Sequence, residues 1–322
     1  MNDEGNGGKT RSSTRSEKNP SAVPPKKPAQ PAILTAPTVA RAELNAFLRL
    51  KHGDPHAILG AHHFNGGVVI RAFRPDAEKI EVLSGRKQPL PMTMTHPAGL
   101  FEILLPDLAE IPTYRFRVYY AKDRVFTLRD PYSYLPTLGD LDLHLFAEGK
   151  HESIYEKLGA HVLKLGSIRG VSFAVWAPTA EGVSVVGDFN GWDGRLHQMR
   201  RIGVSGVWEL FVPDLGPGAL YKFEIRTRRR QPFLKADPYA NYTEIPPLTS
   251  SIVFQSKYKF RDREWLGRRV NREHFRQPLS IYEVHFGSWR RRVEEDNRPF
   301  SYREMAGALS DYVQEPGSSG LV

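Results

Sequence analysis

The residue pattern with the clearest chemical meaning is a turn at 185–193, which reads Val-Val-Gly-Asp-Phe-Asn-Gly-Trp-Asp. The valines predict a buried strand, and the Gly, Asn and Asp residues predict a tight turn with Trp192 at its tip. An indole on a rigid turn can stack on the apolar face of a pyranose ring, and nearby Asn or Lys can hydrogen-bond the sugar hydroxyls. The turn therefore predicts a sugar site with Trp192, Asn190 and Asp193 as candidates. Alternatively, Trp192 closes the end of a core, although Phe189 suits that place better.

Two other tryptophans lie in predicted strands. Trp176 belongs to Phe-Ala-Val-Trp-Ala-Pro at 173–178, and Trp208 lies in the centre of an apolar run. Large apolar residues at such positions usually face a core. We therefore expect Trp176 and Trp208 to be buried.

The chain carries no recognisable catalytic group. A retaining glycosidase needs two carboxyl groups about 5 to 5.5 Å apart on a rigid frame. Among the acids after residue 279, Glu283 alone lies on a predicted strand. There is also no G-x-S-x-G elbow, P-loop or dinucleotide-binding fingerprint. We assign no catalytic residue.

Metal, cofactor and nucleic-acid sites are not expected either. His52, His56, His62 and His63 lie close together, but Gly and Pro separate them and the chain has no cysteine. Local capping and loop hydrogen bonds suit these histidines better than zinc. The arginine runs at 228–230 and 290–292 flank strands, where solvated charge is common.

The net charge of +9 is concentrated in two segments. Residues 1–40 carry +3 and residues 257–276 carry +5, so the rest of the chain is nearly neutral. This distribution argues against a nucleic-acid-binding domain, because such a domain carries its basic residues on one face. No apolar run is long enough to span a membrane and no signal peptide is visible, so we expect a soluble, cytoplasmic protein with no membrane partner.

The elements that must position the turn are short strands. A helix is predicted near 44–50, and from there to about residue 254 alternating apolar runs are separated by Gly-, Pro-, Asn- and Asp-rich turns. Strands at such short intervals are typical of β-sandwiches.

An internal repeat shows that there are two such units. Residues 99–108 match residues 206–215 without a gap, at an offset of 107. Other matches follow in the same order: 71–75 with 174–178, 114–116 with 221–223, and 129–132 with 236–239. The chain is therefore expected to be mainly β, with two tandem immunoglobulin-like β-sandwiches.

The remaining segments complete the predicted domain organisation. Residues 280–286 predict a buried strand. Ser301 and Glu304 form a capping box, which predicts a helix that runs to about Gln314. The side chains expected to face inward on this helix are Met305, Leu309 and Tyr312–Val313. One strand followed by one helix resembles the opening unit of a (β/α)₈ barrel. The expected domains are a disordered tail (1–40), a first sandwich with a leading helix (41–150), a second sandwich (151–257), a basic linker (258–278) and a truncated barrel start (279–322).

The order of these motifs resembles the N-terminal portion of the bacterial glycogen branching enzyme (1,4-α-glucan branching enzyme) family. The matching segments are 54–60, 173–178, 187–194, 234–240 and the strand with its following residues at 281–289. The Gly-Asp-Phe-Asn-Gly-Trp string by itself resembles a carbohydrate-binding module of family 48.

The resemblance implies an α-amylase superfamily enzyme that forms α-1,6 branches in glycogen, a glycosyltransferase of carbohydrate metabolism. It implies that Trp192 stacks on sugar and that Lys222 hydrogen-bonds it. The family's catalytic carboxylates have no counterpart here, and 44 residues from Leu279 are too few for a barrel of about 250. We therefore expect a truncated or frameshifted chain that binds α-glucan without catalysis. The alternatives are a non-catalytic glucan-binding protein, or a fragment of a debranching-type or trehalose-forming relative. The first sandwich has no aromatic at the matching turn, so a structural role is expected for it.

Overall fold

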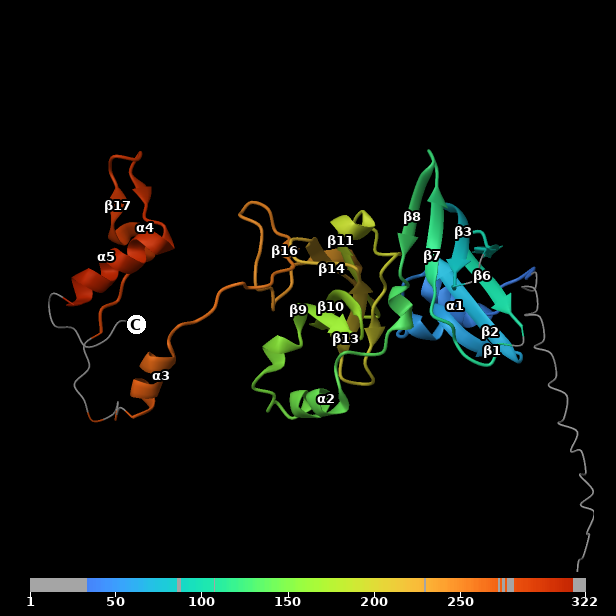
Figure 1. Cartoon of the computed structure of the whole chain (residues 1–322), viewed down its shortest axis with the longest axis horizontal. Helices are drawn as coiled ribbons and strands as arrows, with labels where there is room; N and C mark the ends of the chain where they lie inside the picture. The colour runs from blue at the N-terminus through green and yellow to red at the C-terminus, as the bar shows by residue number, and fades with distance from the viewer. Residues whose placement is uncertain are drawn as a thin grey trace, which may run out of the picture. The chain divides into compact units, whose positions relative to one another are not determined.

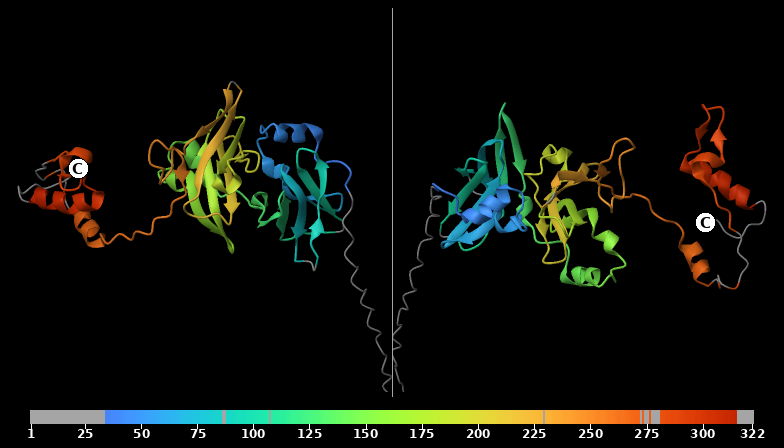
Figure 2. Two further views of the ribbon diagram at one scale, coloured as in Figure 1. Left: turned by 90° about the horizontal axis from the view of Figure 1, so that it is seen from above. Right: turned by 180° about the vertical axis from the view of Figure 1, so that it is seen from behind.

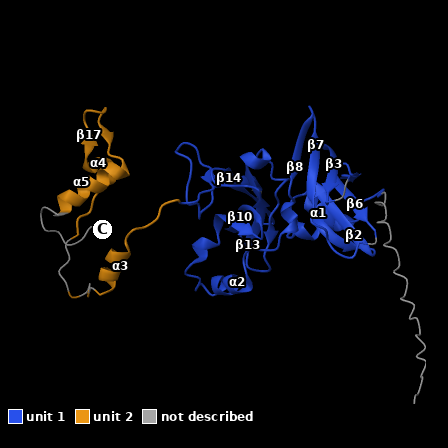
Figure 3. Cartoon of the chain, viewed as in Figure 1, with its two compact units in different colours: residues 1–256 blue, residues 257–322 orange. Residues whose placement is uncertain are grey.

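The computed structural model describes residues 34–314 apart from 86–87, 107, 229, 272, 274–275 and 277–280. Most of the expected tail (1–33), the start of the expected barrel segment (279–280, including the first residue of its strand) and the last residues (315–322) lie outside the described part. The chain divides into two compact units, Met1–Ser256 and Lys257–Val322 (Figure 3). Each is described by itself.

The first pair of antiparallel sheets occupies residues 60–128, coloured blue to teal-green in Figure 1. One sheet has the order β1 (Gly60–Phe64), β2 (Gly67–Phe73), β6 (Leu100–Leu105), β5 (Thr93–His96). The other has the order β4 (Leu90–Pro91), β3 (Ala77–Leu83), β7 (Arg115–Tyr120), β8 (Arg124–Leu128). Val68 and Ile70 of the first sheet share one buried cluster with Ile80 and Phe116 of the second. We call residues 60–128 the first sheet pair.

The second pair of sheets repeats this arrangement at residues 159–252. One sheet runs β12 (Arg200–Arg201), β13 (Val207–Pro213), β10 (Ile168–Trp176), β9 (Gly159–Leu165). The other runs β11 (Gly182–Gly187), β14 (Leu220–Thr227), β15 (Arg230–Lys235), and β16 (Ser251–Ile252) also pairs with β14. Phe173 and Trp208 of one sheet lie in the same cluster as Val185 and Phe223 of the other. We call residues 159–252 the second sheet pair.

The repeat read from the sequence is also present in buried polar contacts. Tyr114 donates its hydroxyl to Asp130 at 2.6 Å, and Tyr221 donates to Asp237 at 2.5 Å. The backbone N–H two residues beyond each aspartate donates to the other carboxylate oxygen. These groups are satisfied in the same way in both halves, which is what a duplicated frame requires.

A second repeated contact ties each sheet pair to the segment before it. Glu102 on β6 accepts hydrogen bonds from the backbone and hydroxyl of Thr38, and Glu209 on β13 accepts the same two bonds from Thr137. An eight-residue helix follows each threonine: α1 (Arg41–Leu48) and α2 (Asp140–Ala147). The predicted α1 is confirmed, whereas α2 was not predicted because its alternating Asp-Leu-Asp-Leu start has no helical period.

The two sheet pairs lie side by side (Figures 1 and 2). Phe47 of α1 contacts Phe73 edge-on, with ring centroids 5.1 Å apart, and both lie in the same buried cluster as Phe173 of the second sheet pair. The Tyr132 hydroxyl accepts a hydrogen bond from the Gln198 backbone at 3.0 Å. Short 3-10 turns lie beside these strands: η1 (Pro55–Ala57), η2 (Pro131–Ser133), η3 (Ile154–Glu156) and η4 (Asp188–Asn190).

One core prediction is wrong. Trp208 is buried as predicted, but Trp176 is 54% exposed. Trp176 is the last residue of β10; it donates its indole N–H to the Ser205 carbonyl and contacts Phe146 of α2 edge-on. Its repeat counterpart Phe73 is only 4% exposed. Phe47 of α1 meets Phe73 edge-on as Phe146 of α2 meets Trp176, but Phe73 also lies in a buried cluster that includes residues of the second sheet pair, and Trp176 does not.

The second compact unit differs from the predicted strand–helix unit. It contains α3 (Arg263–Val270), α4 (Phe286–Trp289), β17 (Arg291–Arg292), β18 (Arg298–Pro299) and α5 (Tyr302–Gln314). Residues 281–286 form no strand apart from a single bridge residue at Tyr282, and Phe286 begins α4, so the strand prediction is wrong for these residues. A buried parallel strand needs neighbours to take its backbone hydrogen bonds, and no described strand pairs with this segment.

The predicted helix is confirmed as α5. Glu304 accepts a hydrogen bond from the Ser301 backbone at 2.8 Å, and the Glu304 backbone donates to the Ser301 hydroxyl at 3.4 Å, which completes the capping box. Met305, Leu309 and Val313 are buried as predicted. Tyr312 is 37% exposed, so the part of the prediction that placed it inward is wrong.

Candidate functional site

The turn that follows β11 is held by the side chain of Asn190. Its amide oxygen accepts from the Gly187 backbone at 2.9 Å, and its amide nitrogen lies 2.9 Å from both the Val185 carbonyl and Nδ1 of His197. Asn190 is buried, and its amide oxygen and amide nitrogen are both hydrogen-bonded within the protein. The sequence pointed to Asn190 as a sugar contact, whereas the structure places it beneath the surface of the turn.

Trp192 lies at the tip of this turn, as expected. Its backbone has a φ of +62°, next to Gly191 at +61°, so the chain reverses through two left-handed residues. Such a conformation is unusual for a bulky residue and often marks a functional position. The indole is 37% exposed, and its Nε1 donates to Asp188 at 3.2 Å. The ring is therefore open to solvent but fixed in orientation.

Phe189 takes the core position beside the turn. Its ring stacks on that of buried Phe173, with centroids 5.9 Å apart and an interplanar angle of 24°, and it meets His197 edge-on. This arrangement argues against the alternative that Trp192 closes the end of the core, because Phe189 packs there.

Lys222 lies on β14 next to the strand that enters the turn. It is directly opposite Val186 of β11, and its neighbours Tyr221 and Phe223 lie in the core. Since strand side chains alternate between faces, Lys222 points away from the core. Its ammonium donates to the Thr249 hydroxyl at 2.8 Å and has two further protons to donate.

Asp193 is engaged with Arg195. It accepts from the Arg195 backbone at 2.9 Å and from the guanidinium at 2.6 Å. Burial raises the pKa of Asp193, but the hydrogen bonds from Arg195 outweigh it and the net shift is downward. Arg195 also reaches Asp76 of the first sheet pair at 3.4 Å, so this pair links the turn to the other half of the unit.

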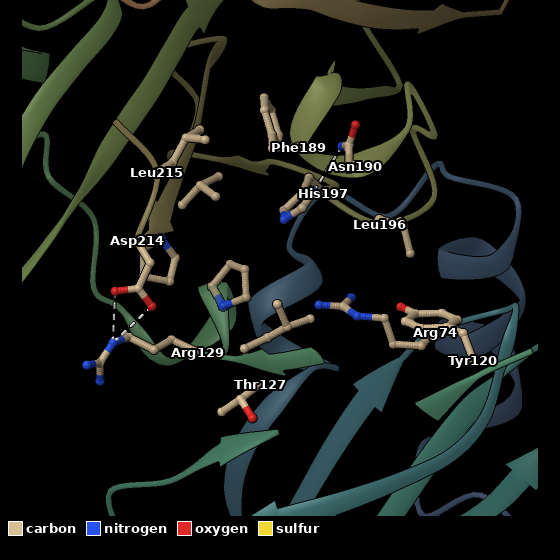
Figure 4. Close-up of a pocket in the computed structure, with 14 residues that line it drawn as sticks. Arg74, Tyr120, Thr127, Arg129, Phe189, Asn190, Leu196, His197, Asp214 and Leu215 are labelled. Atoms are coloured by element: carbon tan, nitrogen blue, oxygen red, sulfur yellow. Dashed lines mark hydrogen bonds and ion pairs between the residues drawn. The ribbon is translucent and has the colours of Figure 1, made fainter. Parts of the chain in front are cut away.

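A cavity of about 260 Å³ lies behind the turn, between the two sheet pairs (Figure 4). Phe189, Asn190 and His197 form one wall, and Arg74 and Tyr120 of the first sheet pair form another. Burial, followed by the charge of Arg74, lowers the pKa of His197 to about 3, so its imidazole is neutral. No sequence pattern pointed to this cavity, because Arg74 and His197 are far apart in the chain.

The clustered histidines make local contacts. His52 lies 2.6 Å from Glu43, and His62 bonds the Leu59 carbonyl at 2.9 Å, a contact that His161 repeats with Leu158. Within the described residues, no group of three or more His, Cys, Asp or Glu side chains could hold a metal ion. None of the helices described is long and apolar enough to cross a membrane.

Two family matches cover these two halves. Residues 40–132 match the family described as "alpha-1,4-glucan branching enzyme GlgB, N-terminal domain", and residues 157–240 match "Carbohydrate-binding module 48 (Isoamylase N-terminal domain)". The first match covers α1 and the first sheet pair, and the second includes Trp192 and Lys222.

Curated relatives agree with these matches. The chain is 54% identical over 282 residues to the 1,4-alpha-glucan branching enzyme GlgB of Myxococcus xanthus, and 47% identical over 284 residues to that of Paramagnetospirillum magneticum. It is 44% identical over 306 residues to GlgB 1 of Streptomyces coelicolor. The alignments cover 86, 88 and 94% of this chain. The chain spans 38% of the length of each of these relatives.

Proposed function

Because the chain corresponds to the N-terminal portion of the 1,4-α-glucan branching enzyme family, we propose that it takes part in glycogen biosynthesis by binding α-1,4-glucan through its second sheet pair. The observation that carries the proposal is the partly exposed Trp192 indole on a locked turn, which follows the strand that pairs with outward-facing Lys222.

The chemistry of the turn suits a neutral sugar chain. Trp192 offers an apolar face whose orientation is already fixed by the bond to Asp188, so little side-chain entropy is lost on binding. The two free Lys222 protons can be donated to sugar hydroxyls. Both contacts act on an uncharged ligand and need no cofactor.

Asn190 and Asp193 act on the turn rather than on the sugar in this proposal. Asn190 holds the backbone from which Trp192 projects, and Asp193 holds Arg195. We retain Trp192 and Lys222 as the residues that contact α-glucan.

We further propose that each sheet pair is an immunoglobulin-like sandwich, with domains at 41–150 and 151–257. The match of residues 40–132 to the branching-enzyme N-terminal domain favours this family over debranching or trehalose-forming relatives. No residue of the chain is assigned a catalytic role. The purified chain is expected to bind α-glucan without forming α-1,6 linkages, and an iodine-stain and linkage assay that detected new branches would contradict this.

A glycogen pull-down tests the binding site. Trp192→Ala removes one stacking contact and is expected to weaken binding about fivefold, or about 1 kcal/mol. Trp176→Ala is the matched control, because Trp176 is also exposed but lies at the end of β10 rather than on the turn. Equal retention of the wild type and Trp192→Ala on glycogen would contradict the proposal.

A further inference from the structure

The cavity between the sheet pairs is built from both halves of the unit. Arg74, Tyr120 and Leu128 come from the first sheet pair and its edges, while Phe189 and His197 come from the second. Its volume of about 260 Å³ is below the roughly 300–1,000 Å³ typical of ligand pockets, so an occupant must be small.

Arg74 is the unusual residue in this cavity. It is 7% exposed, and its guanidinium donates from Nη1 to the carbonyl of its own neighbour Phe73 at 2.9 Å. Of the carboxylates in the described residues, none lies within 4.0 Å of its guanidinium. Figure 4 shows this guanidinium pointing into the cavity. A guanidinium held away from bulk water, with donors beyond its bond to Phe73, favours an anion as partner.

The fold of the repeat does not need this arginine. Asp130 is the buried carboxylate whose pKa Arg74 influences, and both Asp130 oxygens already accept from Tyr114 and the Tyr132 backbone. The second sheet pair builds the same Tyr221–Asp237 contact with Ala177 at the position that matches Arg74. The Tyr–Asp pair therefore forms without an arginine, and Arg74 is an addition particular to the junction.

The facing wall offers a second donor. Asn190 donates through its amide nitrogen to Nδ1 of His197, so the neutral imidazole carries its proton on Nε2. The charged pair at the rim, Arg129 and Asp214, is 3.1 Å apart and internally neutral. The cavity therefore has the Arg74 guanidinium on one wall and a neutral N–H donor on the opposite wall.

We propose that this cavity binds a small phosphate-type oxyanion, held by the Arg74 guanidinium and assisted by His197. Arginine's planar fork matches two oxygens of such a group, and a tetrahedral anion can accept from two walls at once. The anion is either inorganic phosphate or the phosphate of a small sugar ester. The site uses neither Trp192 nor Lys222, so anion binding and glucan binding can be tested independently of each other.

The test is binding of inorganic phosphate and of glucose 1-phosphate to the full chain at constant ionic strength, followed by thermal shift and calorimetry, with neutral glucose as the control ligand. One or both anions should bind and raise Tm, since a ligand bound to the folded state stabilises it. Binding of one anion alone identifies the source of the phosphate. No binding of either at millimolar concentration overturns the proposal.

Variants locate the site. Arg74→Ala should weaken anion binding at least tenfold. Arg74→Lys should recover part of the lost affinity, because lysine keeps the positive charge but lacks the planar, two-pronged guanidinium. Arg49→Ala is the matched control, since Arg49 is exposed at the end of α1 and does not line the cavity. Unchanged affinity in Arg74→Ala overturns the proposal.

A measurement on the wild type covers the case in which Arg74 variants fail to fold. Backbone amide shifts in a phosphate titration should change most at Arg74, Asn190 and His197, which line the cavity. Changes confined to other basic segments, such as residues 257–276, would mean non-specific binding and would refute the site.

Discussion

The two sheet pairs share a frame and differ in what they present on it. Each contains a buried Tyr–Asp pair and a buried glutamate that binds the threonine of the preceding segment. Only the second carries an aromatic residue on a locked turn, because the strand that matches β11 leads into Ser84 and Gly85. The duplicated contacts therefore maintain the fold, and the variable turns and the junction are where binding is expected.

The same comparison bears on the different exposure of Phe73 and Trp176, two aromatic residues that occupy the same position of the repeat. Phe73 lies in a buried cluster that also includes residues of the second sheet pair, whereas Trp176 lies outside that cluster and is exposed. The position in the repeat sets the direction of a side chain, and the residues packed around it set its burial.

The largest expected effect separates these two positions. Phe73→Ala should lower the free energy of unfolding by about 3–5 kcal/mol, because it leaves a cavity at the junction. Trp176→Ala should lower it by about 1 kcal/mol or less, as for other exposed residues. Urea unfolding of both variants measures this; equal losses would mean that Trp176 is covered in solution.

The next effect tests whether the two frames are equivalent. Tyr114→Phe and Tyr221→Phe each remove the hydroxyl bonded to a buried aspartate and should each cost about 1–3 kcal/mol. Similar losses in the two variants would support a duplicated frame. A loss confined to one sheet pair would show that the pairs are held by different contacts.

A pH effect distinguishes the second sheet pair. His197 occupies the position matched by Leu90, and its pKa is lowered to about 3 by burial and by Arg74. Between about pH 6.5 and 3 the unfolded state binds a proton that the folded state does not, so stability falls as pH falls, by up to about 1.4 kcal/mol per unit. His197→Leu should flatten this part of the stability–pH curve. An unchanged slope would contradict the burial of a neutral His197.

The smallest effect is expected when a tryptophan is introduced into the first sheet pair at the turn that matches the Trp192 turn. Ser84→Trp places an aromatic after β3 in a Ser-Gly-Arg-Lys segment that has no asparagine to match Asn190, so glycogen retention should remain unchanged. A gain as large as the fivefold loss expected for Trp192→Ala would show that an exposed indole suffices and that the locked turn is unnecessary.

Much of this arrangement was predictable from the sequence because it is local. The repeat matches, the strand–turn motif before Trp192, the core role of Phe189 and the Ser301–Glu304 capping box all depend on residues a few positions apart. The strand predicted at 280–286 failed for its described residues because a buried strand depends on distant partners. Asn190 was predicted to face sugar because the sequence shows that the turn contains an amide side chain. The sequence does not show in which direction that side chain points.

The sequence by itself determined the duplicated β-frame, the turn that carries Trp192 and the family resemblance, since each follows from periodicity or a short motif. Only the tertiary structure decided that Phe73 is covered while Trp176 is exposed, and that Arg74 meets His197 across a cavity. The meeting of Arg74 and His197 depends on how one sheet pair packs against the other, which brings together residues more than a hundred positions apart. The alternation of side chains along a strand determines which face of the sheet a residue lies on. The packing of the two sheet pairs determines which residues that face contacts.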